Sequence, residues 1–315
     1  MIKENLLELS SYEIYGEKLN PLIRFFYQIL PPLQLHIWGG LGSQLYGISK
    51  FQELRPKLQF RKIDIYFHSS GVTRRLPEIT KLLPPEIDFF FVNDFDDFVQ
   101  SSKSIQTNKL NLKNKFLKYS RKIAINLKFV MSLDEWGQFP CLWTLQVRGH
   151  YRNQDIPKSI IKQILNIAMS AKLLEIDSQH EEYIAIHYRL DDLINLKNTV
   201  DAKLLMHQIF EIKEKFGLAK VLLLSDSFEL AKQKLYPIPI YNTEEFTDPW
   251  SAINLGINSK VFIGTNSKLS YWIVLFRLMI DSNSVNFLPK SNESEFRKTK
   301  YVSSENLFFY KEFIK

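Results

Sequence analysis

The stretch Tyr183-Ile-Ala-Ile-His-Tyr-Arg-Leu-Asp-Asp192 indicates the fold class most clearly. Its apolar run, Ile184 to Ile186, is typical of a strand buried on both faces of a parallel sheet. Ionisable residues follow this run at once, namely His187, Arg189, Asp191 and Asp192. In open α/β sheets, ligands bind beyond the carboxyl ends of the strands. We therefore expect a ligand site here, with the guanidinium of Arg189 suited to a phosphate.

Strands and helices are expected to alternate along most of the chain. Short apolar runs predict strands over 33–38, 63–67, 87–92, 183–188, 221–224, 238–240 and 261–263. Periodicity and capping signals predict helices over 43–54, 74–83, 158–174, 201–216, a segment ending near 235, 249–258 and 267–280. Between 93 and 153 the pattern blurs, and long loops with an irregular helix are expected. Such alternation implies parallel sheets with right-handed crossovers.

The chain is expected to divide into two domains. At 315 residues it is long for one core. Polar residues and Pro157 interrupt the periodicity over 153–157. We therefore predict domains over 1–155 and 156–315, each Rossmann-like and doubly wound, facing each other across a cleft.

Composition favours a cytoplasmic protein. Hydrophobic residues make up 45% and charged residues 24%, as in soluble globular proteins. A single cysteine, Cys141, rules out an intramolecular disulfide and favours a reducing compartment. The N-terminus lacks the basic start and apolar core of a signal peptide. No stretch approaches the roughly 18–20 uncharged apolar residues of a spanning helix.

The net charge of +7 favours anionic partners. Basic and apolar residues alternate over 109–128, as in amphipathic segments that lie on an anionic membrane. A solvated helix face or a basic loop explains this pattern equally well, so both interpretations stay open. Peripheral contact with the inner face of the cytoplasmic membrane is one expectation. Nucleic acid is not expected as a partner, because no recognised binding motif accompanies the charge.

The glycine-rich turn Gly39-Gly-Leu-Gly-Ser-Gln-Leu45 joins a predicted strand to a helix, as phosphate loops do. The third glycine of a dinucleotide loop would fall on Leu45, and the second strand ends in His68-Ser69 without a ribose-binding carboxylate. A nicotinamide cofactor is therefore not expected, and these glycines are more often structural.

Asp94 and Asp96 have the spacing of a metal-binding pair, but such triplets are common in turns. The six histidines show no metal-ligand spacing. We therefore expect no metal site.

Two more predicted strands end in polar residues. Ser225-Asp226 ends one, and Asp226 is expected to accept from a base or a ribose. Thr265-Asn266-Ser267 ends the other and opens a helix, whose N-terminal amides favour an anion. Taken alone, Asn266-Ser267 would be an ordinary helix cap. Three polar strand ends in one sheet favour a ligand site.

Five motifs occur in order between about residues 33 and 290. They are GGLGSQLY at 39–46, HYRLDD at 187–192, SD at 225–226, DPW at 248–250 and GTNSKLSYW at 264–272. Together they resemble the motifs of the bacterial α-1,2-fucosyltransferases of glycosyltransferase family 11, which include GGLGNQxFQ, HxRRGD, SDD and SNSSFSWW. The resemblance implies a GT-B fold. It also implies inverting, metal-independent transfer from GDP-fucose to a polysaccharide or O-antigen acceptor, either an oligosaccharide or a lipid-linked glycan.

The same resemblance implies roles for single residues. Arg189 matches the arginine expected on the donor diphosphate, and His187 holds the same strand end. The remaining matches are Asp192, Asp226, the phosphate-side Asn266 and Ser267, and the cleft-facing Gly40, Gly42 and Gln44. The chain departs from the family where Leu190 replaces a second arginine and where Ser43, Gly47, Asp191 and Lys268 replace asparagine, glutamine, glycine and serine. The donor sugar or nucleotide could therefore differ.

We expect direct displacement at the anomeric carbon. Asp191 or Asp192 is the nearest candidate base, while Arg189 and the helix end over 265–267 stabilise the leaving diphosphate. Asp191 or Asp192 could instead orient Arg189. A transferase with another UDP- or GDP-hexose donor is the first alternative. A catalytically silent glycan- or nucleotide-binding protein is the second.

Overall fold

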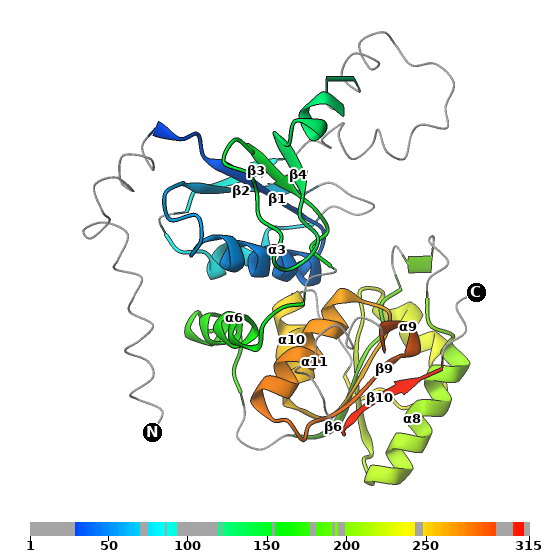
Figure 1. The fold of residues 1–315 in the computed structure, drawn as a ribbon. Coiled ribbons are helices and arrows are strands. Elements are labelled where there is room, and N and C mark those ends of the chain that lie inside the picture. The colour runs from blue at the N-terminus through cyan, green and yellow to red at the C-terminus, as the bar shows by residue number, and fades with distance from the viewer. Residues whose placement is uncertain are drawn as a thin grey trace, which may run out of the picture.

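The computed structural model describes residues 29–69, 75–85, 87–92, 119–120, 122–152, 155–176, 181–190, 193–194, 199–242, 248–293 and 305–311. These residues form two five-stranded sheets, one in each half of the chain (Figure 1). The described strand pairs are all parallel. The expected α/β fold class, GT-B-like with two Rossmann-like sheets, is confirmed.

The N-terminal sheet has the strand order β3-β2-β1-β5-β4. Its strands are β1 (Leu33–Trp38), β2 (Ile63–His68), β3 (Phe89–Val92), β4 (Val130–Ser132) and β5 (Gln146–Arg148). Helix α3 (Leu41–Leu54) follows β1 as predicted, whereas the helix expected over 74–83 is the short 3-10 helix η2 (Glu78–Leu82). Pro77 precedes η2 and Pro84 follows it, and neither residue can donate a helical hydrogen bond. The sequence did not predict β4 and β5, which have three residues each.

The C-terminal sheet has the order β10-β9-β8-β6-β7. Its strands are β6 (Glu181–His187), β7 (Lys220–Leu224), β8 (Ser259–Gly264), β9 (Val285–Pro289) and β10 (Leu307–Tyr310). Its helices are α8 (Ala202–Phe216), α9 (Phe228–Lys234), α10 (Pro249–Asn258) and α11 (Lys268–Ile280), and α6 (Lys158–Ser170) precedes them. Asp201 caps α8 by accepting the N–H groups of Lys203 and Leu204, as predicted.

Strand β6 is buried on both faces, as its sequence predicts. Tyr183 and Ala185 belong to a core that also includes residues of the N-terminal sheet, and Ile184 and Ile186 belong to a second core on the opposite face. The predicted strand over 238–240 is wrong. Pro237 and Pro239 cannot donate to a ladder. Instead, the side chain of Asn242 exchanges two hydrogen bonds with the backbone of Leu223 at the edge of the sheet.

The two halves are joined through helices α3 and α11. A Cβ atom on Gly42 would lie 2.5 Å from the backbone nitrogen of Leu269, so only glycine allows this approach. The ring of Tyr46 packs against the edge of Trp272 with 5.4 Å between centroids. Helix α6 packs against both α3 and α11. The domain division at 155/156 stays a prediction, because α6 belongs to the core shared by both sheets.

No helix in the described part of the chain has the length and apolar character needed to cross a bilayer.

Candidate functional site

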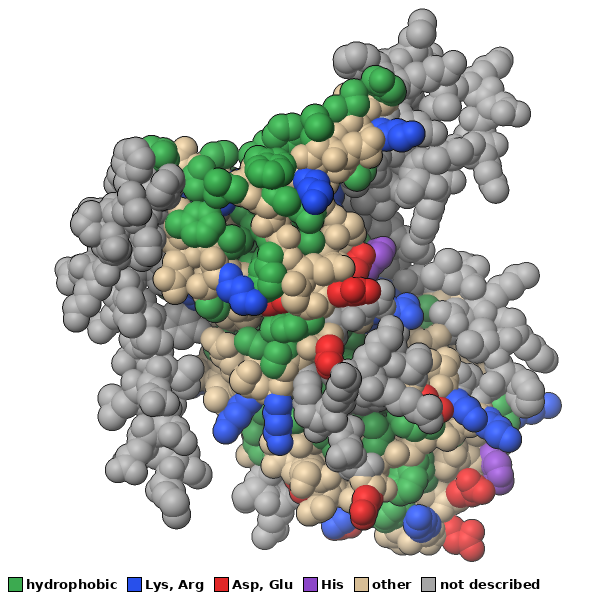
Figure 2. All heavy atoms as spheres, in the orientation of Figure 1, with side chains coloured by type: hydrophobic (Ala, Val, Ile, Leu, Met, Phe, Trp, Pro, Cys, Tyr) green, Lys and Arg blue, Asp and Glu red, His purple; other side chains and the backbone are tan. Residues whose placement is uncertain are grey.

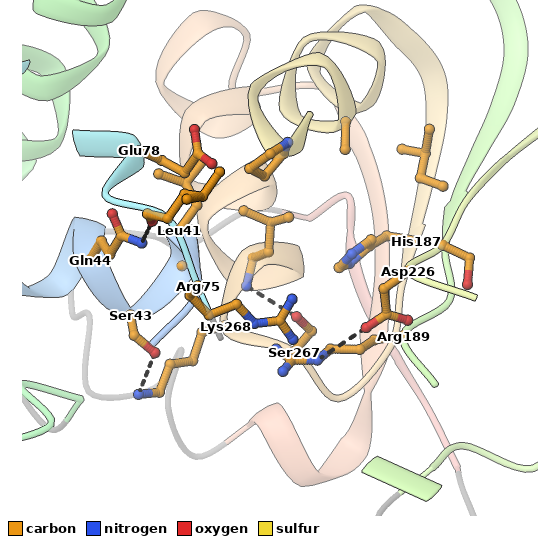
Figure 3. A pocket seen from close by; sticks show the side chains of 18 residues that line it. Leu41, Ser43, Gln44, Arg75, Glu78, His187, Arg189, Asp226, Ser267 and Lys268 are labelled. Atoms are coloured by element: carbon orange, nitrogen blue, oxygen red, sulfur yellow. Dashed lines mark hydrogen bonds and ion pairs between the residues drawn. The ribbon is translucent and has the colours of Figure 1, made fainter. Parts of the chain in front are cut away.

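A cavity of about 380 Å³ lies between the two halves. It lies beyond the carboxyl ends of β1 in one sheet and of β6 and β7 in the other, where ligands bind in open α/β sheets. Figure 3 shows its lining side chains. Both halves contribute to the wall, which is formed by Gly40, Leu41, Gly42, Ser43, Gln44, Arg75, Leu76, Glu78, His187, Arg189, Leu224, Ser225, Asp226, Pro249, Ala252, Ser267, Lys268 and Leu269.

Two guanidinium groups line the cavity from opposite halves. Arg189 follows β6 in the C-terminal half, and Arg75 precedes η2 in the N-terminal half. In Figure 3, Arg75 extends across the cavity in the direction of Ser267 and Arg189. A ligand phosphate placed between them would be attracted to both guanidinium groups. The pair therefore favours an anionic ligand that contacts both halves.

Asp226 fixes the position of Arg189. Its Oδ2 lies 3.7 Å from Nε of Arg189, and its Oδ1 accepts the backbone N–H of Leu190 at 2.9 Å. Both side chains are about a quarter exposed. We expected the carboxylate of Asp226 to accept a hydrogen bond from a nucleotide base or a ribose. In the structure both of its oxygens already have partners within the protein. Its role toward a ligand stays a prediction.

His187 lies in a hydrogen-bonded network with Ser270 and Thr265. The Oγ of Ser270 lies 2.6 Å from Nδ1 of His187 and accepts the backbone N–H of Thr265 at 3.2 Å. Either the hydroxyl donates to Nδ1 of a ring protonated on Nε2, or Nδ1–H donates to the hydroxyl, depending on the tautomer of the ring. Burial and the charge of Arg189 lower the pKa of His187 to about 3. The ring is therefore neutral, with little capacity as a base.

Thr265 has a structural role. It is fully buried, donates to the carbonyl of His187 at 2.9 Å and accepts the N–H of Arg189 at 3.1 Å. Neither Thr265 nor Asn266 is among the residues that line the cavity. Ser267 lines it and also caps α11 by accepting the N–H of Leu269, so the ordinary cap that we considered is present. The N-terminal ends of α3, α10 and α11 all contribute to the cavity wall, and each carries a positive partial charge.

Gln44 joins the glycine turn to the segment that carries Arg75. Its fully buried amide donates to the carbonyls of Gly39 and Leu76 at 2.9 and 2.8 Å and accepts the N–H of Ile79 at 3.3 Å. Both amide hydrogens are therefore used within the protein. The predicted turn residues Gly40, Gly42 and Gln44 all line the cavity, and Gly42 also serves the contact between the halves.

Two residues that differ from the motifs of family 11 contact each other. Nζ of Lys268 donates to Oγ of Ser43 at 3.1 Å, joining the first turns of α11 and α3 (Figure 3). Leu190, at the position of the family's second arginine, is fully buried in the second core with residues such as Val200 and Leu205. Position 190 therefore faces away from the cavity in this protein.

Glu78 was not identified from the sequence. It lines the cavity from the N-terminal half, and its backbone carbonyl accepts the indole N–H of Trp250 at 3.1 Å. Burial, with a smaller contribution from the carboxylate of Asp248, raises the pKa of Glu78. A carboxylate in a cleft is a stronger proton acceptor when its pKa is raised, so Glu78 is a candidate general base. Arg75 and Glu78 follow β2, so the rule of strand ends was the available signal.

Several predicted residues lie outside the described part of the chain. These are the candidate bases Asp191 and Asp192, the pair Asp94 and Asp96, and positions 109–118 and 121 of segment 109–128. Among the described residues, no group of three or more His, Cys, Asp or Glu side chains is arranged to hold a metal ion.

No family model matches the chain, and no curated protein does. Similar solved structures include POFUT1 in complex with GDP, at 14% identity and a TM-score of 0.30, covering 64% of this chain and 65% of that one. POFUT1 in complex with GDP-fucose has 13% identity and a TM-score of 0.28, with 78% and 73% covered. A further GDP complex of POFUT1 has 13% identity and a TM-score of 0.35, with 89% and 98% covered. The resemblance to family 11 thus rests on the motifs alone.

Proposed function

We propose that the protein is an inverting glycosyltransferase that binds a nucleotide diphosphate sugar in the cavity between its halves. The observation that supports this most is the placement of Arg75 and Arg189 on one cavity from opposite halves. Guanidinium forks match phosphate oxygens, and the N-terminal ends of three helices add positive potential. A cavity of about 380 Å³ falls within the range of small-molecule sites.

The reaction forms a bond between the acceptor hydroxyl oxygen and the anomeric carbon of the donor. The bond from that carbon to the diphosphate breaks, and its electron pair leaves on the diphosphate. Arg75, Arg189 and the start of α11 stabilise this developing charge. Positive charge from the protein would fulfil the role that a metal ion has in other transferases, so we propose a metal-independent reaction.

Glu78 is our proposed general base. It lies on the wall from the N-terminal half, whereas Arg189 and Ser267 lie on the wall from the C-terminal half. Direct displacement needs the nucleophile and the leaving group on opposite sides of the anomeric carbon. The acceptor proton would pass to the carboxylate of Glu78. Asp191 and Asp192 remain the alternative bases from the sequence.

The proposed donor and acceptor follow from the motif resemblance, and the proposed location follows from the composition. GDP-fucose is the favoured donor, and a saccharide of a surface polysaccharide or O-antigen is the favoured acceptor, within the cytoplasm. On this proposal residues 1–155 bind the acceptor and residues 156–315 bind the donor, except that Arg75 of the N-terminal half also contacts the donor diphosphate. A transferase for another GDP- or UDP-hexose is the second candidate. It is favoured by the burial of Leu190, which leaves one arginine in the 187–190 segment on the cavity.

A thermal-shift screen of GDP, UDP and their sugars tests the proposal. We expect GDP and GDP-fucose to raise the melting temperature, because binding to the native state stabilises it. Slow release of fucose from GDP-fucose without acceptor would separate an enzyme from a silent binding protein. Stabilisation by UDP alone would move the proposal to the second candidate, and no shift with any nucleotide would overturn it.

A further inference from the structure

Two segments of the N-terminal half form an exposed apolar surface, which we name the 122–129/142–145 patch. Seven large apolar side chains in it are between 39% and 57% exposed, namely Ile123, Ile125, Leu127, Phe129, Leu142, Trp143 and Leu145. Figure 2 shows hydrophobic side chains in a band along the upper edge of this half. Apolar surface gathered in this way is typical of a site that binds another molecule or a membrane.

Hydrogen bonds hold the two segments of the patch together. The indole N–H of Trp143 donates to the carbonyl of Leu127 at 2.9 Å, and the hydroxyl of Thr144 donates to that of Lys128 at 2.8 Å. The backbone N–H of Leu145 donates to the carbonyl of Phe129 at 2.8 Å. The apolar side chains therefore project from a fixed backbone, and their exposure is a property of the fold.

The sequence around the patch is strongly basic. From residue 98 to residue 133 it contains eight Lys and Arg residues and no Asp or Glu. Lys122 and Lys128 lie within the patch itself, and both are exposed. A second copy of the chain placed on this surface would set cation against cation. An anionic surface is complementary to it in both charge and polarity.

We propose that the 122–129/142–145 patch binds the surface of an anionic lipid bilayer. Its apolar side chains enter the boundary between headgroups and acyl chains, while Lys122 and Lys128 contact lipid phosphates. The ring of Trp143 suits this boundary, where indole side chains are enriched in membrane proteins. This inference is independent of the proposed transferase activity.

The patch and the cavity lie at opposite ends of the N-terminal sheet. Phe129 and Leu145 precede β4 and β5, whereas Gly40 follows β1, which runs parallel to β5. The six residues of β1 correspond to a separation of about 20 Å at roughly 3.3 Å per residue. A bilayer bound at the patch therefore leaves the cavity open, and an acceptor sugar at the end of an extended lipid-linked glycan could reach it.

Sedimentation with lipid vesicles tests the inference on the full chain. We expect binding to vesicles rich in phosphatidylglycerol and much weaker binding to pure phosphatidylcholine. The double variant Ile125→Ser/Leu142→Ser should bind the anionic vesicles about tenfold more weakly or worse, because two apolar side chains are lost from the contact. Phe210→Ser removes a comparably exposed side chain from α8, and its binding should be unchanged.

A second variant guards against misfolding of the first. Lys122→Glu leaves every apolar side chain in place, and it should weaken binding to anionic vesicles while the melting temperature stays that of the wild type. Release of sugar from a soluble donor should be unchanged in both variants. The inference would be overturned if the wild type did not bind anionic vesicles. It would also be overturned if both variants bound them as tightly as the wild type does. A third outcome would also overturn it, namely a wild-type protein that is a dimer and a variant Ile125→Ser/Leu142→Ser that is a monomer. The patch would then bind a second copy of the chain.

Discussion

The carboxylate of Asp226 contacts the guanidinium of Arg189, with 3.7 Å between Oδ2 and Nε. Its second oxygen accepts the N–H of Leu190 and so fixes the turn after β6. One side chain thereby orients the arginine and holds the backbone that carries it. This arrangement presents Arg189 to the cavity before a ligand binds, which lowers the entropy cost of ordering it.

Replacing Arg189 tests its role toward the diphosphate. A lost contact between a guanidinium and a charged oxygen costs about 1.5–3 kcal/mol. Arg189→Ala should therefore lower turnover by about 10- to 150-fold at 1.4 kcal/mol per factor of ten. The melting temperature should stay near that of the wild type, because Arg189 is partly exposed. Steady-state kinetics measure the effect, with the exposed Lys234→Ala as the control, and turnover near the wild-type value would exclude Arg189 from the site.

Glu78→Gln tests the proposed base. General-base catalysis contributes roughly 10²–10⁴ in rate, so transfer to the acceptor should fall by about that factor while GDP binding persists. The base must be ionised, and its pKa is raised. The wild-type rate should therefore fall as the pH falls through that raised pKa, and this limb should be absent from the residual activity of the variant. Glu214→Gln on the exposed face of α8 is the control. An unchanged transfer rate would move the role of base to Asp191 or Asp192.

The lowered pKa of His187 predicts that the free energy of unfolding depends on pH. The native state keeps it neutral down to about pH 3, whereas the unfolded chain binds a proton near pH 6.5. The unfolded state is therefore favoured progressively as the pH falls from 6.5 toward 3. At about 1.4 kcal/mol per pH unit, the wild type should lose roughly 2–3 kcal/mol between pH 7 and pH 4.5 through this group.

Urea denaturation of His187→Gln at both pH values measures this loss. The variant should lose about 2–3 kcal/mol less than the wild type between them, whatever its stability at pH 7. His207 is exposed on α8, so His207→Gln should behave as the wild type does. An equal loss of stability in His187→Gln and the wild type would show that His187 titrates normally.

Two glycines of the same turn should respond differently to substitution. A Cβ on Gly42 would lie 2.5 Å from the backbone of Leu269, whereas one on Gly40 would lie 3.9 Å from Arg75. Gly42→Ala should therefore cost about 1–3 kcal/mol of stability, as overpacking does. Gly40→Ala should stay within about 0.5 kcal/mol of the wild type. Chemical denaturation gives both values, and equal stability of the two variants would refute the tight contact between α3 and α11.

The site residues that lie at the strand ends of the C-terminal sheet could be predicted from the sequence. Carboxyl ends of parallel strands meet at one edge, so His187, Arg189 and Ser267 were expected together and do line one cavity. Arg75 and Glu78 follow β2, so the rule of strand ends indicated their region, but their approach to the C-terminal half depends on how the two halves pack. That packing depends on the contact of Gly42 with Leu269, two residues far apart in the sequence.

The local sequence also did not predict the direction in which some side chains point. Leu190 follows Arg189 directly, yet it points into the second core, so a motif position did not indicate a ligand contact. The short strands β4 and β5 were not predicted because three residues carry little periodicity. Gln44 lines the cavity as expected, but the sequence did not predict that its amide also holds the chain around Leu76.

The central claim is that one diphosphate contacts arginines of both halves. Isothermal titration calorimetry with GDP tests it most directly, on the wild type, Arg75→Ala, Arg189→Ala and the control Lys203→Ala. We predict that the wild type and the control bind GDP alike. Each arginine variant should bind about tenfold or more weakly, since each loses a charge-assisted contact. Absence of GDP binding by the wild type, or binding by Arg75→Ala that equals it, would contradict the claim.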